Sequence, residues 1–223
     1  MTGAKEELHA FLQSTFACSG EVAVSIGRRA MNRSFPAKAV ILRQGECANA
    51  TLLLVDGRAH ALLYAMEGQI VLLHEFVPGD LFGAIACEHP EPEEADVLAV
   101  EDVRTLAFLA ADFVALLEMH GGVALAVSKM LLKRLRTLSA RMAERTTLSA
   151  AGRVHAELLR LARLGDGRTI KPAPVLAALA VRVHSTRETV SRTINALERR
   201  GIIRRADDSL IIVAPHRLEE MVV

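Results

Sequence analysis

The amino-acid sequence predicts an α+β fold class: an amino-terminal antiparallel β-roll, one long helix and a carboxyl-terminal winged helix-turn-helix. Three observations carry this prediction. Short apolar runs separated by turn residues occupy residues 35–108, an apolar stripe repeats every three or four residues across 122–146, and two helical patterns joined by a short polar turn occupy 173–199. The expected domains are residues 1–120, the long helix with its hinge at 121–147, and the winged domain at 148–223.

The composition is that of a globular protein with buried cores. The 223 residues are 51% hydrophobic, and the formal net charge of +1 argues neither for nor against a nucleic-acid partner. Cys18, Cys47 and Cys87 form no Cys-x-x-Cys pair, so reduced core thiols are expected. No window approaches about eighteen uncharged apolar residues, and the first residues lack the pattern of a signal peptide. We therefore expect a cytoplasmic location and no membrane contact.

The amino-terminal half has the pattern of short antiparallel strands. Four apolar or alternating runs lie at residues 40–42, 50–55, 60–64 and 70–77. The breaks between and after them carry strong turn chemistry, namely Gln44-Gly45-Glu46, Asp56-Gly57, Glu67-Gly68 and Pro78-Gly79-Asp80. Strands of this length and spacing are typical of a small barrel or roll.

A long helix is expected from Gly122 to Thr146, about 25 residues or roughly 37 Å. One side of it carries residues spaced four, three, four, three and four apart: Ala124, Ser128, Leu131, Leu135, Leu138 and Met142. This spacing is typical of a coiled-coil seam between two copies of the chain. A core helix packed on its own β-roll could use the same stripe.

Three shorter segments follow the long helix. Residues 147–150 have the composition of a hinge, and 151–164 read as a second helix before a Gly-Asp-Gly loop. Residues 173–183 predict a compact helix with Pro174 at its first position. His184-Ser185-Thr186 then forms a polar turn, in which Ser185 or Thr186 can cap the next helix.

The next helix begins at Arg187 and has the side chains of a base-contacting helix. Val190, Ile194 and Leu197 form its apolar stripe. The side chains that point away from the stripe are Arg187, Glu188, Ser191 and Arg192. Arginine can donate two hydrogen bonds to guanine, glutamate can accept one from cytosine N4, and serine can contact a base or a phosphate. An ordinary solvated helix is the alternative, which the neighbouring segments disfavour.

A wing follows this helix. Gly201 can end the helix in the left-handed conformation, and residues 202–213 read as a strand, an Asp-Asp-Ser turn and a second strand. Residues 182–205 contain seven arginines and two glutamates, a charge of +5 that suits DNA phosphates. Ser185, Thr186, Ser191 and the flanking arginines are therefore expected to hold the backbone, while Arg187, Glu188 and Arg192 contact bases.

The segment Arg187-Glu-Thr-Val-Ser-Arg192, with residues 179–183 before it and 197–202 after it, resembles the recognition region of one bacterial family. This is the family of the cyclic-AMP receptor protein and the fumarate-nitrate reductase regulator (Crp/Fnr), and the resemblance spans nearly all 223 residues. It implies a cyclic-nucleotide-binding-like sensor roll, a homodimer that binds an inverted repeat with half-sites close to TGTGA, and RNA polymerase as a partner. His184 departs from the family, which often has glycine in the turn.

The sensor part departs from the nucleotide-binding members of the family. They hold the ribose with a Gly-Glu pair and the phosphate with an Arg-Ser pair, where this chain has Gly83-Ala84 and Glu94-Ala95. Residues 88–102 carry seven carboxylates and no lysine or arginine, so an anion is repelled there. We expect that cyclic AMP is not bound in the usual way, with Arg104 as the nearest substitute cation.

The residues of the effector pocket follow from the same resemblance. The candidates are Gly83, Ala84, Glu94, Ala95 and Ser139, the last of which matches a family position that contacts the base. The effector itself, and whether there is one, stays open. So do the choice between activation and repression and the target genes.

Two other classes of function are compatible with parts of the sequence. A metal- or haem-binding β-roll could use His60, His74, Glu75 and His89, but His74 and Glu75 are adjacent and would face opposite sides of a strand. An architectural DNA-binding dimer without sequence preference is the other class. We expect no catalytic residue, no metal and no resident cofactor, and hence a protein that is not an enzyme.

Overall fold

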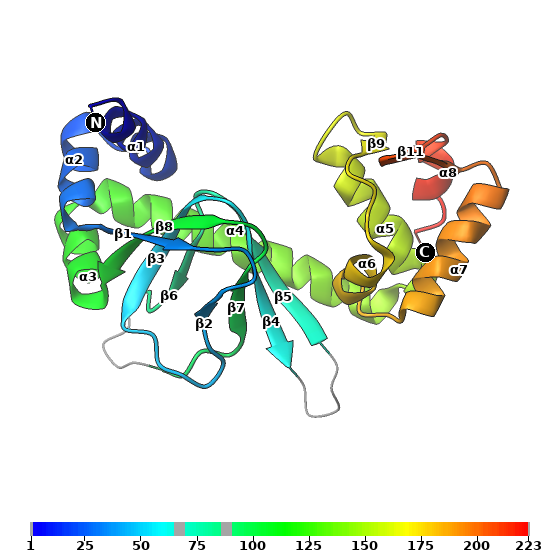
Figure 1. Cartoon of the computed structure of the whole chain (residues 1–223), viewed down its shortest axis with the longest axis horizontal. Coiled ribbons are helices and arrows are strands. Elements are labelled where there is room, and N and C mark those ends of the chain that lie inside the picture. Colours follow the sequence, from blue (N-terminus) through cyan, green and yellow to red (C-terminus); the bar gives the residue numbers. More distant parts are fainter. Residues whose placement is uncertain (1, 65–69, 86–90, 223) are drawn as a thin grey trace. The chain divides into compact units, whose positions relative to one another are not determined.

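The computed structural model describes residues 2–64, 70–85 and 91–222 and divides the chain into two compact units, Met1–Leu135 and Arg136–Val223. Figure 1 shows the elements of each unit in the colours of the sequence. The boundary between the units lies inside the long helix, α4 (Gly121–Thr147), which the sequence analysis treats as a segment of its own.

The first unit contains two four-stranded antiparallel sheets (Figure 1). One has the strand order β1-β8-β3-β6 and the other β2-β7-β4-β5. Their strands are β1 (Met31–Phe35), β2 (Val40–Leu42), β3 (Ala50–Asp56), β4 (Ala59–Tyr64), β5 (Ile70–Phe76), β6 (Leu81–Gly83), β7 (Asp96–Ala99) and β8 (Val103–Leu109). The predicted antiparallel β-roll is confirmed, and the four runs read from the sequence became β2, β3, β4 and β5.

Alternation along the strands builds two cores in this unit. Leu53 and Leu106 face helices α1 (Thr2–Phe16) and α2 (Gly20–Arg29), whereas Leu52 and Leu54 face the second sheet. Helix α3 (Ala110–Met119) packs Phe113 and Leu116 into the same core as α1. Fully burying one such side chain contributes about 1.5–3 kcal/mol, so these contacts fix the roll.

Two of the predicted turns have the geometry that their residues require. Gly57 has φ +83°, and a Cβ there would lie 2.3 Å from the carbonyl oxygen of Asp102. In the Pro-Gly-Asp turn, Gly79 has φ +98°, and the Asp80 carboxylate accepts a hydrogen bond from the backbone N–H of Val77 at 2.9 Å. The predicted turn at Glu67-Gly68 lies outside the described residues.

The second unit holds the last part of α4 and the remainder of the chain after it. Its elements are α5 (Ala150–Arg163), β9 (Thr169–Ile170), α6 (Leu176–Arg182), α7 (Arg187–Arg199), β10 (Ile203–Ala206), β11 (Ser209–Ile212) and α8 (Pro215–Glu219). Strands β10 and β11 form the predicted wing, and β9 adds a third strand beside β11 that the sequence analysis does not anticipate. One apolar core joins α5, α6 and α7 to this sheet.

Three local predictions in this unit need correction. Helix α6 begins at Leu176, so Pro174 lies two residues before the helix and not at its first position. The reason is that Ala173 donates its backbone N–H to the carbonyl oxygen of Asp208 at 3.0 Å, which holds this segment outside the helix. The turn between α6 and α7 has four residues, 183–186, and Ser209 belongs to β11 and not to the wing turn.

A helix that spans a membrane must be both long enough and apolar enough to cross the hydrocarbon core. No single one of the described helices meets both requirements; only α3 and α4 taken together do so, by length and composition, and they are bent by 114°.

Candidate nucleic-acid interface and sensor cavity

Helix α7 is fixed to its unit by one face and presents the other to solvent. Val190, Ile194 and Leu197 are buried in the core, as predicted. Arg187, Glu188 and Arg192 are exposed, while Ser191 is half-buried at the edge of the exposed face. The helix therefore offers two guanidinium groups and one carboxylate, which are the groups that donate to guanine and accept from cytosine.

The first turn of α7 is held by a threonine cap. The side-chain oxygen of Thr186 accepts the backbone N–H of Thr189 at 3.2 Å, so Thr186 is the cap and Ser185 is not. Arg192 donates to the hydroxyl of Thr189 at 3.5 Å, which orients its side chain along the exposed face. Hydrogen bonds from the backbone N–H of Glu188 and the hydroxyl of Thr186 lower the pKa of Glu188, which is therefore ionised and able to accept hydrogen bonds.

The turn before α7 contains a strained residue. His184 has φ +48°, in the left-handed region that side chains other than glycine disfavour. Arg153 of α5 holds this turn by donating to the carbonyl oxygens of Val183 at 2.9 Å and His184 at 3.3 Å, and it also donates to Leu148 at 3.0 Å. Burial and the nearby Arg145, Arg153 and Arg141 lower the pKa of His184 to about 4, so the imidazole is neutral near pH 7.

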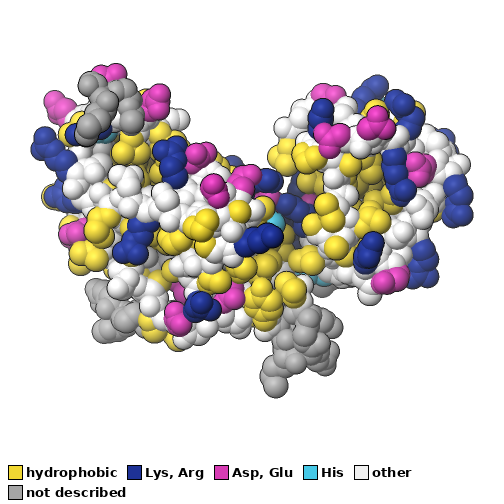
Figure 2. Space-filling view, viewed as in Figure 1, with side chains coloured by type: hydrophobic (Ala, Val, Ile, Leu, Met, Phe, Trp, Pro, Cys, Tyr) yellow, Lys and Arg dark blue, Asp and Glu magenta, His cyan; other side chains and the backbone are white. Residues whose placement is uncertain are grey.

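The wing is tied to α7 by one arginine. Gly201 has φ +66°, which confirms the predicted left-handed end of the helix. Arg205 of β10 donates to the side-chain oxygen of Asn195 at 2.6 Å and lies 3.6 Å from a carboxylate oxygen of Glu198. Arg204 is exposed on the same strand. Figure 2 shows lysine and arginine side chains gathered along the edge of the unit that α7 and the wing form.

One arginine of the predicted basic patch has a different position. Arg182 of α6 has a side chain only 18% exposed, and its Nη1 lies 3.5 Å from the carboxylate of Glu157. It forms an ion pair inside the unit, unlike the exposed arginines that were counted with it in the basic segment. In sequence, Arg182 has the same charge and spacing as its exposed neighbours, and only the tertiary contact distinguishes it.

Five of the six predicted seam residues are exposed on α4, and the sixth, Ala124, is half-buried. Leu131 is 44% exposed, Leu135 60%, Leu138 41% and Met142 70%. The helix instead buries Val123 and Val127 against its own unit. The predicted stripe is therefore not the face by which α4 packs on its own β-roll, which was the alternative.

A cavity of about 240 Å³ lies in the first unit at the predicted effector pocket. Gly83, Ala84, Glu94 and Ala95 all line it, together with an apolar surface that includes Phe76. Gly83 has φ +81°, and a Cβ there would lie 2.6 Å from the carbonyl oxygen of Ala50. Ala84 and Ala95 are buried, whereas Glu94 is exposed at the rim.

Ser139, the fifth candidate for the effector pocket, lies elsewhere in the chain. It is exposed on the part of α4 that belongs to the second unit, whereas all residues that line this cavity belong to the first.

Arg134 is a residue of this cavity that the sequence analysis misses. Its guanidinium carbon lies 5.1 Å from the centre of the Phe76 ring, within the range of a cation–π contact. Burial lowers the pKa of Arg134, although Asp80, Glu93 and Glu94 act to raise it. Nothing in the sequence distinguishes this arginine from the other basic residues of α4, because its role depends on how the helix packs.

Arg104, the substitute cation proposed from the sequence, does not line the cavity. It lies on β8, where its Nη2 is 3.2 Å from the carboxylate of Asp56, and it borders a different cavity beside α1. Among the described residues that line the effector cavity, Arg134 is the one with a positive charge, and it is accompanied by Glu91, Glu93 and Glu94.

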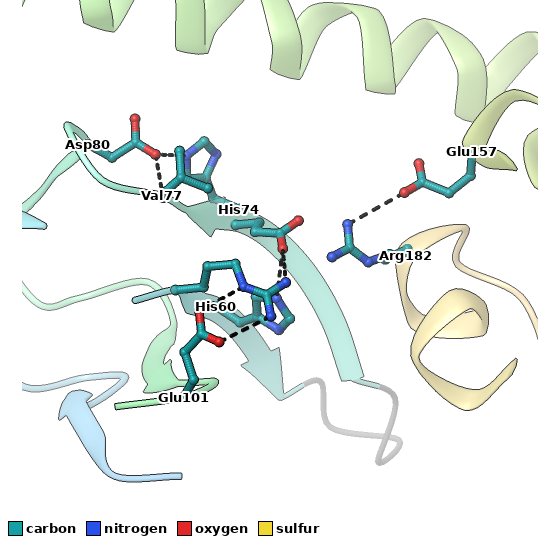
Figure 3. Close-up of polar contacts among 9 residues, drawn as sticks. His60, His74, Val77, Asp80, Glu101, Glu157 and Arg182 are labelled. Atoms are coloured by element: carbon teal, nitrogen blue, oxygen red, sulfur yellow. Dashed lines mark hydrogen bonds and ion pairs between the residues drawn. The ribbon is translucent and has the colours of Figure 1, made fainter. Parts of the chain in front are cut away.

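The histidines weighed as metal or haem ligands have other partners. His60 lies 3.5 Å from a carboxylate oxygen of Glu75. Figure 3 shows His74 beside Asp80, and the two side chains are 3.8 Å apart. His74 and Glu75 therefore contact different residues, Asp80 and His60 respectively. Within the described ranges no three histidine, cysteine or acidic side chains are grouped as a metal site would require. His89 lies outside the described residues.

Comparison with known proteins places both parts of the chain. Residues 32–120 match the cyclic nucleotide-binding domain, and residues 152–221 match the Crp-like helix-turn-helix domain. The "Cyclic AMP receptor protein" of Thermus thermophilus is 31% identical over 190 residues, which cover 85% of this chain and 87% of that protein. A "CRP-like cAMP-activated global transcriptional regulator" of Mycobacterium tuberculosis is 25% identical over 82% of this chain and 84% of its own length.

Solved structures have the same fold. FixK2 from Bradyrhizobium japonicum aligns with a TM-score of 0.73 at 20% identity, over 87% of this chain and 98% of its own. A CooA mutant from Carboxydothermus hydrogenoformans aligns with a TM-score of 0.77 at 20% identity, over 92% of this chain and 91% of its own. Taken with the exposed polar face of α7 and the wing beside it, these matches show that the chain belongs to the Crp/Fnr family of bacterial transcription regulators, which bind DNA through a helix-turn-helix domain.

Proposed function

We propose that the protein works as a homodimer that recognises an inverted repeat with a pair of α7 helices. The observation that carries this proposal is the exposure of Arg187, Glu188 and Arg192 on a helix whose opposite face is buried. The two arginines would each contact a guanine, and Glu188 would accept a hydrogen bond from a cytosine N4. By resemblance, the half-sites lie close to TGTGA.

The residues around this face would position the domain on the DNA backbone. Thr186 is exposed, and its hydroxyl, which donates to Glu188 in the free chain, would donate to a phosphate instead in the complex while its oxygen still caps the helix. Ser185 and Ser191 lie at the edge of the same face, with Arg199, Arg200 and Arg204 exposed nearby. These contacts supply affinity and salt dependence but little sequence preference.

The dimer would form along α4, through Ala124, Ser128, Leu131, Leu135, Leu138 and Met142. Large apolar side chains that are exposed in one chain at coiled-coil spacing are covered when two such helices pair. A two-fold axis along this seam would bring two α7 helices to successive major-groove turns on one face of the DNA.

For the sensor roll, we propose that the cavity lined by Gly83, Ala84, Glu94 and Ala95 binds cyclic AMP weakly or not at all, although relatives are named for that nucleotide. Three glutamates line it, and Asp80 stands close enough to Arg134 to act on its pKa. A cyclic phosphate would therefore meet one cation already surrounded by carboxylates. We expect any effector of this cavity to lack the negatively charged phosphate of cyclic AMP.

The proposed recognition of DNA also implies where the protein acts and with which partner. We propose that it is not an enzyme, that it acts in the cytoplasm, and that RNA polymerase is its partner at promoters. The relatives named above are regulators, which supports this role.

The experiment that tests the proposal is selection from a random DNA library by the purified full chain, with and without added cyclic AMP. We expect an enriched inverted repeat that is the same in both conditions and survives an excess of competitor DNA. Enrichment of no sequence would favour the architectural class over this proposal. Enrichment only with cyclic AMP would contradict the proposed sensor.

A further inference from the structure

The second unit contains a buried carboxylate that no base or phosphate contact explains. Glu157 of α5 is 3% exposed and is the one carboxylate among the buried residues of the described chain. Burying an ionised carboxylate costs several kcal/mol unless cations compensate it. The partners of Glu157 therefore indicate why the charge is placed there.

Two arginines from different helices compensate it, one on each oxygen. Arg160 of the same helix donates to one carboxylate oxygen of Glu157, and Arg182 of α6 lies 3.5 Å from the other, as Figure 3 shows for Arg182. Arg160 also donates to both carboxylate oxygens of Glu144 on α4, at 2.8 and 2.9 Å. Burial acts to lower the pKa of Arg160, but Glu157 and Glu144 raise it overall, so the guanidinium stays charged.

These four side chains form a continuous bridge across three helices. It runs from Glu144 near the end of α4, through Arg160 and Glu157 on α5, to Arg182 at the end of α6. At one end, the same segment of α4 carries Leu138 and Met142 of the proposed seam. At the other end, α6 shares its core with α7.

The backbone between α4 and α5 fixes their relative orientation less firmly than these side-chain contacts do. Helix α4 ends at Thr147 and α5 begins at Ala150, so only residues 148 and 149 join them. A two-residue connection limits the reach of α5 but leaves its rotation about the hinge to be fixed by side chains. The planar guanidinium of Arg160 uses Nη2 for Glu144 of α4 and Nη1 for Glu157 of its own helix, and two fixed partners on one rigid plane make it suited to fix that rotation.

We propose that Glu144 and Arg160 are positioning residues that hold the DNA-recognition helix at a fixed angle to the dimer helix, and so set the spacing between half-sites that the dimer accepts. This inference rests on the proposed homodimer and inverted repeat. One base pair added between half-sites moves them by about 3.4 Å and rotates them by about 35°. A rigid bridge cannot follow that rotation, whereas a loosened hinge can.

The test uses Glu144→Ala, which removes the connection to α4 but leaves both partners of buried Glu157 in place. Its matched control is Glu219→Ala, which removes the other carboxylate paired with α5, the partner of Arg163 at 3.0 Å on α8. Affinities of the full-length proteins are measured by fluorescence anisotropy on the selected operator, on operators with one or two base pairs added or removed at the centre, and on a single half-site.

We expect the wild-type and Glu219→Ala proteins to lose about fivefold or more in affinity when the spacing is changed by one base pair, and Glu144→Ala to lose less than about twofold. All three should bind the single half-site equally and keep the same dimer mass. If Glu144→Ala keeps the spacing preference of the wild type, the inference is overturned. It is also overturned if Glu144→Ala loses affinity equally for every DNA, because Glu144 would then only stabilise the fold. A wild-type protein without preference for an inverted repeat would instead overturn the proposed function, and the inference with it.

Discussion

Arg153 donates a hydrogen bond to the carbonyl oxygen of His184, at 3.3 Å, and thereby holds the residue whose backbone is in the left-handed region. The same guanidinium holds the carbonyl oxygens of Val183 and Leu148. A residue with a side chain is disfavoured in this conformation by about 1–2 kcal/mol, so the turn is maintained by the three bonds from Arg153 and by the core beneath it.

This relationship leads to a prediction for the pH dependence of stability. Because the pKa of His184 is lowered to about 4 in the folded chain and is near 6.5 when unfolded, the unfolded chain binds the extra proton between these values. The free energy of unfolding should therefore fall as the pH falls from about 7 towards 4. His184→Asn, which removes the titrating group and tolerates the left-handed region, should flatten this dependence in urea unfolding at pH 5 and pH 7.5.

The control for this prediction is His216→Asn, at a side chain that is 97% exposed. It should leave the pH dependence as it is in the wild type. An equal pH dependence in His184→Asn and the wild type would show that other groups cause it.

Arg192→Ala should weaken binding to the selected operator by about 1–3 kcal/mol and relax the preference for one guanine in each half-site. The reason is the loss of a bidentate donor to guanine O6 and N7 from the exposed face of α7. Competition among operators with single substitutions measures the preference. Arg204→Ala, on the wing, is the matched control and should weaken all sequences alike. The same uniform loss in Arg192→Ala would identify Arg192 as a phosphate contact.

Leu131→Glu combined with Leu138→Glu should convert the protein to monomers that bind DNA poorly, because like charges would meet across the two-fold seam. Sedimentation equilibrium measures the mass directly. Lys129→Glu combined with Arg136→Glu changes more charge on exposed positions of the same helix outside the stripe, and it should leave a dimer. A dimer mass retained by the leucine double variant would remove the seam assignment.

Calorimetry should detect weak binding of cyclic AMP, or none, to the unmodified protein. Replacing Glu94 by arginine and Ala95 by serine should raise the affinity, because a phosphate-binding pair is created in the lining of the cavity, with the arginine at the rim and the serine in the buried wall. Adding Arg134→Met to that variant should reduce the gain, because the side chains at positions 134 and 94 both line the cavity. A dissociation constant in the micromolar range for the unmodified protein would mean that Arg134 already serves as the phosphate clamp.

The winged half of the fold was predictable because its signals are local. The apolar stripe of α7, the Thr186 cap and Gly201 all act within a few residues of where they stand in the sequence. The runs read from the sequence covered β2 to β5 but not β1, β6, β7, β8 or β9. Strands β6 and β9, with three and two residues, are too short to show a period, and β2, equally short, was found only because its three residues, Val-Ile-Leu, are all apolar.

The remaining parts of the candidate sites depend on contacts between distant segments. Arg134 belongs to the sensor cavity only because α4 lays it over Phe76 of β5. Arg182 is paired inside the second unit, unlike the exposed arginines of the basic segment, because Glu157, 25 positions earlier in the chain, is buried beside it. Charge and spacing in the sequence are the same for an arginine in either setting, so no local pattern separates them.

In the proposed dimer, the exposed leucines of α4 would connect the stability of this regulator to its concentration. Where a folded unit covers apolar surface only by association, its free energy of unfolding rises with the logarithm of protein concentration. At low protein concentration, free subunits would be favoured by mass action. An operator that holds two subunits side by side would then act as a template for assembly, and occupancy of the site would rise more steeply than in proportion to the amount of protein.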